Sequence, residues 1–365
     1  MKISEIIQFL ETIAPPRLQE SYDNAGLLVG DKEKTCAGIL IALDVTEEII
    51  EEAVQKNCNL IVAHHPVIFR GIKKLTGNNF VGRTVILAIK KDVAIYAIHT
   101  NLDNVLHGVN KKIAEKLNLQ NCKVLLPKEG TLKKLVTFAP SKNAGEVRDA
   151  LFGVGAGAIG NYNECSFNLE GTGTFKPLEG SDPYTGKIGE RHLEKETRIE
   201  VIFPEYFQKQ LINSLKKTHP YEEVAYDIYS LANVRDDVGS GLLGDLEEST
   251  ASKQFLNILK EKFGIPAIKH TKIVKKEIKK VALCGGAGFF LLPEAISSGA
   301  DIFVTSDIKY HEYFDADNRI LLADIGHYES EQFTIELIAE ILQKKLPNFA
   351  VLKTEINTNP VSYFI

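Results

Sequence analysis

Two kinds of segment alternate along residues 38–119: short apolar runs, and longer stretches whose apolar positions recur at helical spacing. The apolar runs predict buried strands, and the periodic stretches predict helices. Their order along the chain is strand 38–43, helix 46–56, strand 60–63, helix 82–91, strand 93–100 and helix 109–117. Such alternation is typical of a mostly parallel sheet that helices cover on both faces.

The C-terminal part of the chain repeats this alternation. Residues 53–65 align without a gap to residues 295–307, and both stretches run from a helical pattern into an apolar strand. The strands expected in this part are 280–283, 302–305, 320–324 and 350–353. We interpret the match as a duplicated α/β/α half-domain, although a chance repeat of a common helix–strand pattern would look the same.

Residues 128–234 have a different pattern. They are expected to form strand 134–138, helix 144–152, strand 164–169, a stretch rich in glycine and proline at 171–189, strand 197–203, helix 205–217 and strand 224–229. This β-α-β-β-α-β order predicts a ferredoxin-like α+β domain. Because a module with its own core can be inserted where chain ends lie close together, residues 1–127 and 235–365 are expected to form one discontinuous α/β domain.

The composition is that of a globular protein. Its 365 residues are 44% hydrophobic and 25% charged, and the formal net charge is -5. A chain of this length is expected to form two or three domains, and its acidic balance argues against nucleic-acid binding. Lysines between residues 269 and 280 form a local basic run, for which a solvated strand face or a guarded sheet edge is the simpler explanation.

Three features indicate a cytoplasmic protein. The five cysteines include no Cys-x-x-Cys pair, which argues against a disulfide framework and a zinc ribbon. Residues 1–14 have apolar positions at helical spacing with acidic residues between them, unlike a signal peptide. No apolar run approaches the ~18 residues that a membrane helix needs.

Candidate metal ligands follow three of the expected strands. Two histidines come directly after the run 59–63, an aspartate follows strand 93–100, and a histidine and a glutamate four positions apart follow strand 320–324. In chain order these residues are His64, His65, Asp103, His327 and Glu331. Because the carboxyl ends of parallel strands line one edge of a sheet, the five side chains are expected to converge.

The chemistry of this set constrains the metal. Imidazole and carboxylate ligands suit zinc, iron(II) or manganese, and they suit calcium poorly. Five protein ligands are too many for one catalytic ion with an open position, but they fit two divalent ions about 3.5–4 Å apart with a bridging carboxylate and water. Taken singly, each part has a simpler explanation: a polar loop for His64 and His65, surface neighbours for His327 and Glu331, and a helix N-cap for Asp103.

Five short motifs resemble those of one family. They are Asp23-Asn24-Ala25-Gly26-Leu27, Ala63-His64-His65-Pro66, His99-Thr100-Asn101-Leu102-Asp103, Thr305-Ser306-Asp307-Ile308-Lys309-Tyr310-His311 and Gly326-His327-Tyr328-Glu329-Ser330-Glu331. In this order they resemble the Nif-three-like dinuclear metal proteins, often labelled GTP cyclohydrolase I type 2 homologues. The resemblance implies the same five metal ligands and a PII- or CutA-like insert, whose likeness rests on residues 157–162 and 219–224. It also implies a homohexameric ring, a toroid, built as a trimer of dimers.

Two divalent ions at such a site suggest hydrolysis by a metal-bridging hydroxide at neutral pH. The substrate is expected to be nucleotide-like or to carry a phosphate, because backbone amides of the glycine run 284–288 can bind an anion between a strand and a helix. A tight strand-to-helix turn explains this run equally well. The family label names a purine-ring-opening reaction on GTP, but nothing in these residues identifies guanine.

Further residues are candidates for roles around the metals. His99 and His311 are candidate proton-transfer residues, and Asp23, Asp307 and Lys309 are candidate substrate contacts. A buried structural histidine at position 99, and a surface ion pair between Asp307 and Lys309, are equal alternatives. The alternative function is a non-enzymatic metal-binding scaffold or sensor whose inserted domain binds a small ligand or a protein partner.

Overall fold

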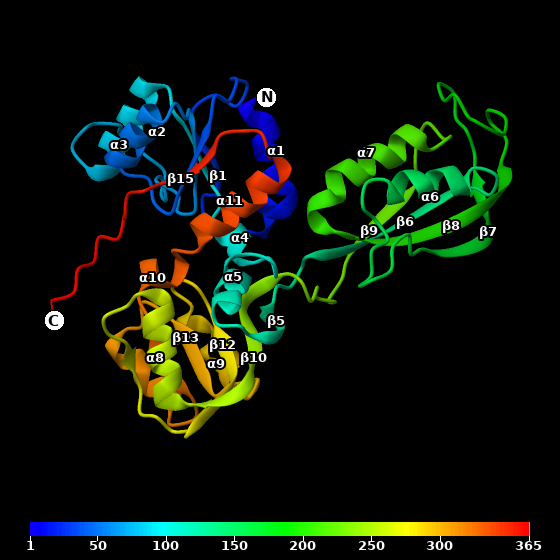
Figure 1. Cartoon of the computed structure of the whole chain (residues 1–365). Coiled ribbons are helices and arrows are strands. Elements are labelled where there is room, and N and C mark those ends of the chain that lie inside the picture. Colours follow the sequence, from blue (N-terminus) through cyan, green and yellow to red (C-terminus); the bar gives the residue numbers. More distant parts are fainter. Residues whose placement is uncertain (365) are drawn as a thin grey trace. The chain divides into compact units, whose positions relative to one another are not determined.

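The computed structural model describes residues 1–364 of the chain. It has a mixed α/β fold with three sheets, and it divides into two compact units (Figure 1). Unit 1 comprises Met1–Pro127 and Asp236–Ile365, and unit 2 comprises Lys128–Arg235. Among the described residues, no helix combines the length and the apolar character that a membrane crossing needs.

The first sheet of unit 1 has the strand order β1-β4-β3-β2-β15. Its strands are β1 (Gly26–Val29), β2 (Ile39–Ala42), β3 (Leu60–Ala63), β4 (Ala94–Ala97) and β15 (Val351–Lys353). The four strands from β4 to β15 are parallel, and β1 is antiparallel to β4. The last strand, which the sequence placed with the C-terminal repeat, therefore crosses back to complete the N-terminal sheet.

The second sheet of unit 1 has the order β11-β14-β13-β12-β10-β5. Its strands are β5 (Gln120–Pro127), β10 (Gly239–Ala251), β11 (Lys269–His270), β12 (Glu277–Leu283), β13 (Ile302–Thr305) and β14 (Leu321–Asp324). β12, β13 and β14 are parallel, whereas β5, β10 and β11 pair antiparallel to their neighbours. The lysine run begins on β11, at the edge of this sheet, and Lys269 Nζ lies 2.6 Å from Asp324 Oδ2.

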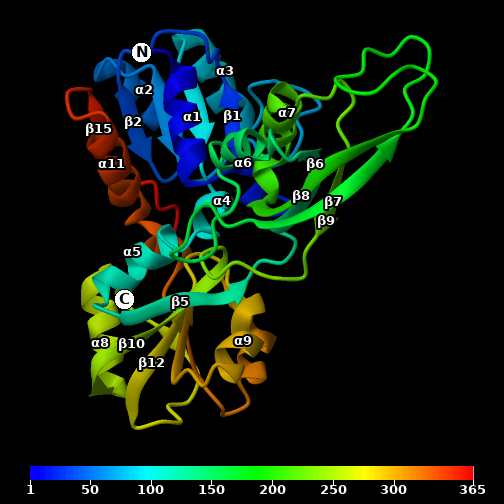
Figure 2. The ribbon, with the colours of Figure 1, turned by 90° about the vertical axis from the view of Figure 1, so that its right-hand side faces the viewer.

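Helices cover both faces of the two sheets. One core joins the inner faces of the sheets to the helices α1 (Ile3–Ile13), α5 (Val109–Lys116), α8 (Ser252–Phe263) and α11 (Thr334–Lys345) (Figure 2). The outer face of the first sheet packs on α2 (Glu47–Gln55) and α3 (Phe80–Lys91), and that of the second packs on α9 (Leu292–Ser297). Because the two inner faces share one core, the strand ends of both sheets are held in a fixed relation.

Local signals in the sequence set the helix ends. The Thr46 hydroxyl accepts a hydrogen bond from the Ile49 amide at the start of α2, and the Asn79 side chain does the same for Gly82 in α3. Gly264 ends α8 in the left-handed conformation, with φ of 65°. The remaining short helices of unit 1 are η1 (Pro16–Leu18), α4 (Thr100–Asp103), η3 (Phe289–Leu291), η4 (Tyr310–Ala316) and α10 (His327–Glu331).

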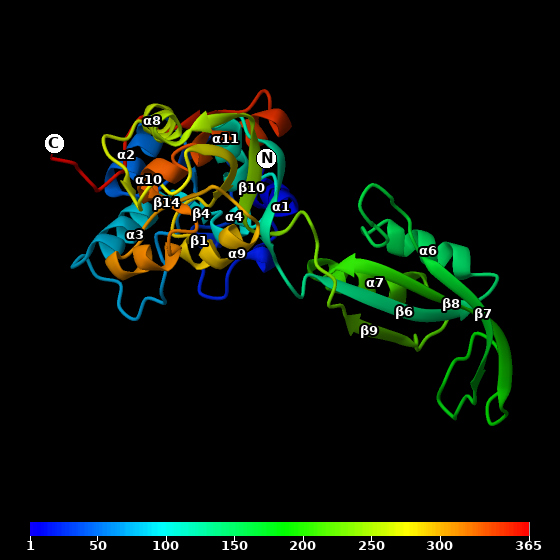
Figure 3. The same ribbon diagram turned by 90° about the horizontal axis from the view of Figure 1, so that it is seen from below.

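Unit 2 is a four-stranded antiparallel sheet with the order β7-β8-β6-β9 (Figure 3). Its elements are β6 (Leu132–Pro140), α6 (Ala144–Phe152), β7 (Phe167–Phe175), β8 (His192–Pro204), η2 (Glu205–Phe207), α7 (Gln208–Thr218) and β9 (Tyr226–Ser230). Both α-helices pack on one face of the sheet through a common apolar core. Part of the stretch 171–189 is not a loop, because β7 continues through Gly171 and Gly173 to Phe175.

His219, directly after α7, is a buried histidine with both ring nitrogens in use. Nε2 lies 2.9 Å from the Phe138 carbonyl oxygen, and Nδ1 accepts a hydrogen bond of 3.1 Å from the Tyr221 amide. These contacts require the neutral ring with the proton on Nε2. Burial accordingly lowers the pKa of His219 below 6.5.

Unit 2 should therefore lose stability as the pH falls below that of an unfolded histidine. The unfolded chain takes up a proton near pH 6.5 and the folded chain takes it up only at lower pH, so the loss begins at about pH 6.5 and ends at the folded pKa. Hydrogen exchange of the full-length protein, converted to opening free energies, should show this in α7 and β9. His219→Gln should flatten the pH dependence there, whereas His107→Gln, an exposed histidine of unit 1, should leave it unchanged. Equal pH dependence in H219Q would contradict the assignment.

Candidate metal centre

His64 and His65 directly follow the last residue of β3. Their amides donate hydrogen bonds to the carbonyl oxygens of Ala42 and Leu43, at 3.2 and 2.9 Å, which ties this turn to the end of β2. His64 is completely buried, and its Nδ1 donates to the Ile98 carbonyl oxygen at 2.9 Å. This contact leaves the lone pair on Nε2 of His64 directed toward the site.

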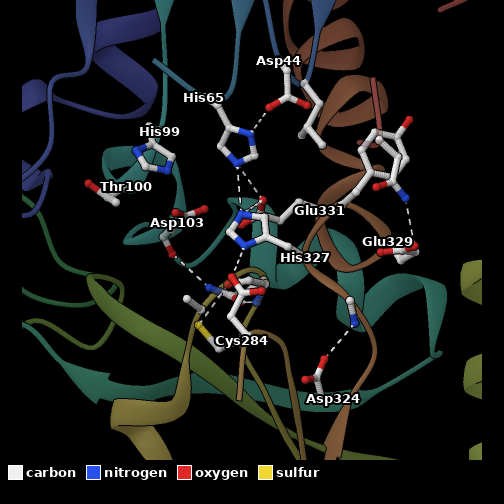
Figure 4. Close-up of a pocket in the computed structure, with 18 of the residues that line it drawn as sticks. Asp44, His65, His99, Thr100, Asp103, Cys284, Asp324, His327, Glu329 and Glu331 are labelled. Atoms are coloured by element: carbon white, nitrogen blue, oxygen red, sulfur yellow. Dashed lines mark hydrogen bonds and ion pairs between the residues drawn. The ribbon is translucent and has the colours of Figure 1, made fainter. Parts of the chain in front are cut away.

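His65 lies between two carboxylates (Figure 4). Its Nδ1 is 2.7 Å from Asp44 Oδ1, and its Nε2 is 2.9 Å from Glu331 Oε2. Asp44, just after β2, is held in turn by the Thr358 hydroxyl, which donates to Oδ2 at 2.7 Å. The ring orientation of His65 is therefore fixed from both sides.

Helix α10 supplies His327 and Glu331, which lie one turn apart on the same helical face. His327 Nε2 is 3.1 Å from Glu331 Oε2 and 3.4 Å from His65 Nε2. On the other side of the ring, Nδ1 is 2.6 Å from Asp307 Oδ2. Glu331 is 3% exposed, so its carboxylate is available only to the groups around it.

Asp103 comes from α4, a short helix where the sequence predicted the end of a strand. Its Oδ1 is 3.6 Å from His64 Nε2, and Glu331 Oε1 is 3.8 Å from the same nitrogen. Both His64 Nε2 and Asp103 Oδ1 are buried, and neither has a hydrogen-bond partner among the described residues. Buried polar atoms without partners are destabilising, and a cation between these two would satisfy both.

The five predicted ligands fall into two trios whose ligand atoms all lie within 4.8 Å of one another. His64, Asp103 and Glu331 form one trio, and His65, His327 and Glu331 form the other. Each trio could hold a metal ion. Glu331 belongs to both, with Oε1 nearest to His64 and Oε2 nearest to His65 and His327.

The pKa values of the residues in this site depend on the charged groups packed closely around each of them. Burial alone would lower the pKa of His65, but Asp44 and Glu331 raise it to about 10. Burial would also lower the pKa of His327, but Asp307 and Glu331 raise it to about 11. Burial opposes ionisation of Glu331, yet hydrogen bonds from His327 and His65 hold its pKa well below 4.5. A divalent cation at Glu331 would therefore compete with protons on two imidazoles.

Four of the five predicted ligands, all except His64, line a cavity of about 680 Å³ at the strand ends. The C-terminal segment forms part of its wall, through Asn359, Pro360, Val361 and Tyr363. The Asn359 side chain donates to Glu329 Oε1 at 3.0 Å. The cavity volume is within the range typical of small-molecule sites.

His99, a predicted proton-transfer residue, also lines this cavity. Its ring centroid is 5.2 Å from that of His64 and 5.4 Å from that of His65. Its Nδ1 lies 2.8 Å from Asp23 Oδ1. Asp23 itself was expected to contact substrate, but its side chain is wholly buried behind His99 and does not line the cavity. The Asp23 carboxylate also accepts a hydrogen bond from the Thr100 amide, so its role is to orient the strand end and the His99 ring.

Of the other three candidate residues, one lines the cavity and two do not. Asp307 lines the cavity, and it orients His327. Lys309 is 84% exposed beside Glu312 and does not line the cavity. His311 is exposed in η4 next to Tyr310, and it too is outside the cavity lining. The motif that contains all three residues therefore delivers only Asp307 to the site.

The glycine run 284–288 does not offer the anion cradle that the sequence suggested. The amides of Gly285, Gly286 and Gly288 donate to the side chains of Asn110, Ser330 and Thr305, at 3.0, 2.9 and 2.9 Å. Gly286 has φ of 64°, and a Cβ there would collide with Glu331 Oε1. The run therefore makes room for the shared carboxylate.

Asp44 is the functional residue that sequence reasoning missed. It directly follows the apolar run 38–43, as the two histidines follow the run 59–63. Position after a strand was thus a usable signal for Asp44, because β2 and β3 are neighbours and end at the same sheet edge.

Comparison with known proteins identifies the family. A model of the family Duf34/NIF3 (NGG1p interacting factor 3) matches residues 1–360. The chain belongs to the Duf34/NIF3 family. The resemblance to Nif-three-like proteins, inferred from five motifs, is thereby confirmed.

Other members of the Duf34/NIF3 family are similar over the full chain. A protein of Halalkalibacterium halodurans named GTP cyclohydrolase 1 type 2 homolog is 39% identical, with 100% of both chains covered. One of Bacillus subtilis with the same name is 38% identical, with 98% of each covered. The crystal structure of a Bacillus cereus protein related to NIF3 has a TM-score of 0.87 at 38% identity, covering 100% of this chain and 99% of that one.

The hydrogen bond from His65 to Asp44 should contribute to metal affinity. Asp44→Asn removes the charge that makes His65 a more basic ligand, so zinc affinity should fall by about 10–100-fold in competition with a chromophoric chelator. Asp23→Asn is the matched control, because it changes the same kind of contact at His99, which is in neither Glu331 trio. Equal losses in the two variants, or none in D44N, would show that Asp44 does not support a ligand.

Proposed function

We propose that this protein is a dinuclear metal-dependent hydrolase. The observation that supports this most directly is the pair of ligand trios that share Glu331. A second is the pair of buried atoms, His64 Nε2 and Asp103 Oδ1, that have no hydrogen-bond partner within residues 1–364. A carboxylate that offers one oxygen to each of two neighbouring sites has the arrangement of a bridging ligand. Zinc, iron(II) and manganese match the donor set of imidazole and carboxylate groups.

Two such ions, when bound, would polarise a substrate and lower the pKa of a water toward neutrality. The chain's own contribution is to hold the ligands in place. Asp44 and Asp307 fix the rings of His65 and His327 through their Nδ1 atoms, and Ile98 does so for His64. This leaves the Nε2 atom of each ring for the metal.

His99 is the residue that we assign to proton transfer. It lines the cavity, and Asp23 fixes its ring through Nδ1. Nε2 is then the atom that can exchange a proton with a bound substrate or its leaving group. The histidine–carboxylate pair has the arrangement that orients a general acid or base in other hydrolytic sites.

We propose a nucleotide-like or phosphate-bearing substrate, on grounds that differ from the sequence argument. The glycine amides are occupied, so phosphate oxygens would have to meet the metal ions or Lys269 at the cavity wall. Aromatic side chains at the same cavity, among them Tyr22 and Phe69 with centroids 6.2 Å apart, suit a planar ring. The relatives' shared name, GTP cyclohydrolase 1 type 2 homolog, is compatible with such a substrate.

The finer architecture also belongs to this proposal. Duplication of the half-domains is supported by the parallel pairs β2–β3 and β12–β13, each of which leads into a site residue, His64 after β3 and Asp307 after β13. A PII- or CutA-like insert is supported by the β-α-β-β-α-β order of unit 2. The hexameric toroid, a trimer of dimers, rests on family resemblance, and native mass spectrometry would test it.

Metal analysis of variants tests the dinuclear arrangement. The protein should bind about two zinc or manganese ions per chain, and Asp103→Asn should reduce this to about one because the His65 and His327 trio stays complete. Glu331→Gln should abolish tight binding at both sites, whereas Glu329→Gln, on the same helix, should retain it. Parallel loss of nucleotide or phosphoester hydrolysis in D103N and E331Q would support the hydrolase.

Two other outcomes would count against the proposal. Failure of the wild-type chain to bind metal would refute the metal centre itself. Full metal occupancy without turnover in a broad screen would favour the alternative, a metal-binding scaffold or sensor.

A further inference from the structure

Unit 2 contains a cavity of its own, and no residue that lines it is a ligand of the candidate metal centre. It measures about 730 Å³ and lies on the sheet face opposite α6 and α7. Ile199 and Val201 of β8 point into the core under the helices, so the alternate residues Glu196 and Arg198 point into the cavity. Residues of the loop after β7 and of the segment before β9 form its walls.

Glycines of β7 hollow the floor of this cavity. Gly171 lies directly opposite Glu196 in the ladder, and Gly173 lies opposite Glu194. A Cβ at Gly173 would collide with the Glu196 carboxylate, which therefore folds across the strand at that point. A Cβ at Gly171 would meet nothing within 4 Å, so the space above it is open.

Four aromatic side chains line the cavity, and three of them form a cluster from separate segments: Phe175, Tyr184 and Tyr221. The ring centroids of Phe175 and Tyr221 are 5.8 Å apart, and those of Tyr184 and Tyr221 are 6.1 Å apart. Aromatic groups at these separations present ring faces and edges to a common space. Such clusters bind cations through the negative potential of the ring faces.

Glu196 places a carboxylate beside this aromatic cluster. It is 9% exposed, and its Oε1 accepts a hydrogen bond of 2.8 Å from the Tyr221 hydroxyl. No ion pair of Glu196 with a lysine, arginine or histidine occurs within the described part of the chain. Arg198, the cationic residue of β8 that lines the cavity, is bound to Glu200 at 2.9 Å. A buried carboxylate without a counter-ion is destabilising, and a cationic ligand would relieve that.

One ring of this cluster, that of Tyr184, already has an ammonium group close to it. The Nζ atom of Lys142 lies 4.9 Å from the centroid of Tyr184. This lysine is exposed and reaches the ring from outside the cavity lining. A ligand that enters the cavity would meet the same kind of ring, with Glu196 on its other side.

We propose that this cavity binds a small organic ammonium ion, a primary amine or quaternary ammonium compound, between the aromatic cluster and Glu196. The volume suits a small molecule, and the wall combines apolar surface with one buried charge. The proposal goes beyond the hydrolase function and does not depend on it, because none of its residues belongs to the metal centre.

Titration of the full-length protein with choline tests charge recognition directly. Its uncharged isostere, 3,3-dimethylbutan-1-ol, has the same shape, so it controls for apolar burial alone. Choline and butylamine should bind measurably by calorimetry or by shifts of unit 2 resonances, and the alcohol should bind at least about tenfold more weakly. Binding should persist after chelator treatment, which separates this site from the metal centre.

Two variants locate the binding. Glu196→Gln should weaken choline binding by about tenfold or more while leaving the alcohol unaffected, because only the charge is removed. Gly171→Val should block the cavity floor at a position where a Cβ meets no atom within 4 Å, and valine is a better strand former, so the melting temperature should hold while binding is lost. Glu146→Gln, an exposed carboxylate on α6, is the matched charge control and should bind like the wild type.

Three results would overturn the proposal. They are no binding of either ammonium probe to wild-type protein, equal binding of choline and the alcohol, and undiminished choline binding in both E196Q and G171V.

Discussion

One buried carboxylate, that of Glu331, organises the candidate metal centre. At 3% exposure it is removed from water, and it can remain ionised only if positive or hydrogen-bonding groups surround it. His65 and His327 supply these groups, and His64 lies beside them with its Nε2 atom 3.8 Å from Glu331 Oε1. The carboxylates of Asp44 and Asp307 in turn fix the rings of His65 and His327. The buried charge of Glu331 therefore positions a set of residues that come from several strand ends. The same set is what a pair of divalent cations would require.

The fold makes this convergence possible by joining two sheets through one core. His65 and Glu331 are 266 positions apart in the sequence, yet their side chains are 2.9 Å apart. The shared core beneath both sheets holds their strand ends at one place. The crossing of β15 to the first sheet ties the C-terminal half to the N-terminal half a second time, parallel to β2. Asp44, which follows β2, is also held by Thr358 from the segment after β15.

The sequence was informative wherever a strand end determined the position of a side chain. His64 and His65 follow a fully apolar run, and the structure brings both to Glu331 at the sheet edge. It was less informative where orientation depends on distant partners. Asp23 belongs to one of the five motifs, but only the structure shows that its carboxylate is hydrogen-bonded to His99 and Thr100. Lys309 and His311 share the motif of Asp307, and the turn into η4 directs them elsewhere.

Glycine was the residue whose role the sequence indicated least well. The run 284–288 suggested either an anion cradle or a tight strand-to-helix turn, and the stretch 171–189 was noted only for its glycine and proline content. In the structure, Gly286 and Gly173 are each placed where a Cβ would collide with a buried carboxylate, that of Glu331 or Glu196. Local sequence cannot reveal this use of glycine, since the approaching carboxylate belongs to another segment. What surrounds each carboxylate then distinguishes the two sites: imidazoles around Glu331 favour a metal ion, and aromatic side chains around Glu196 favour an organic cation.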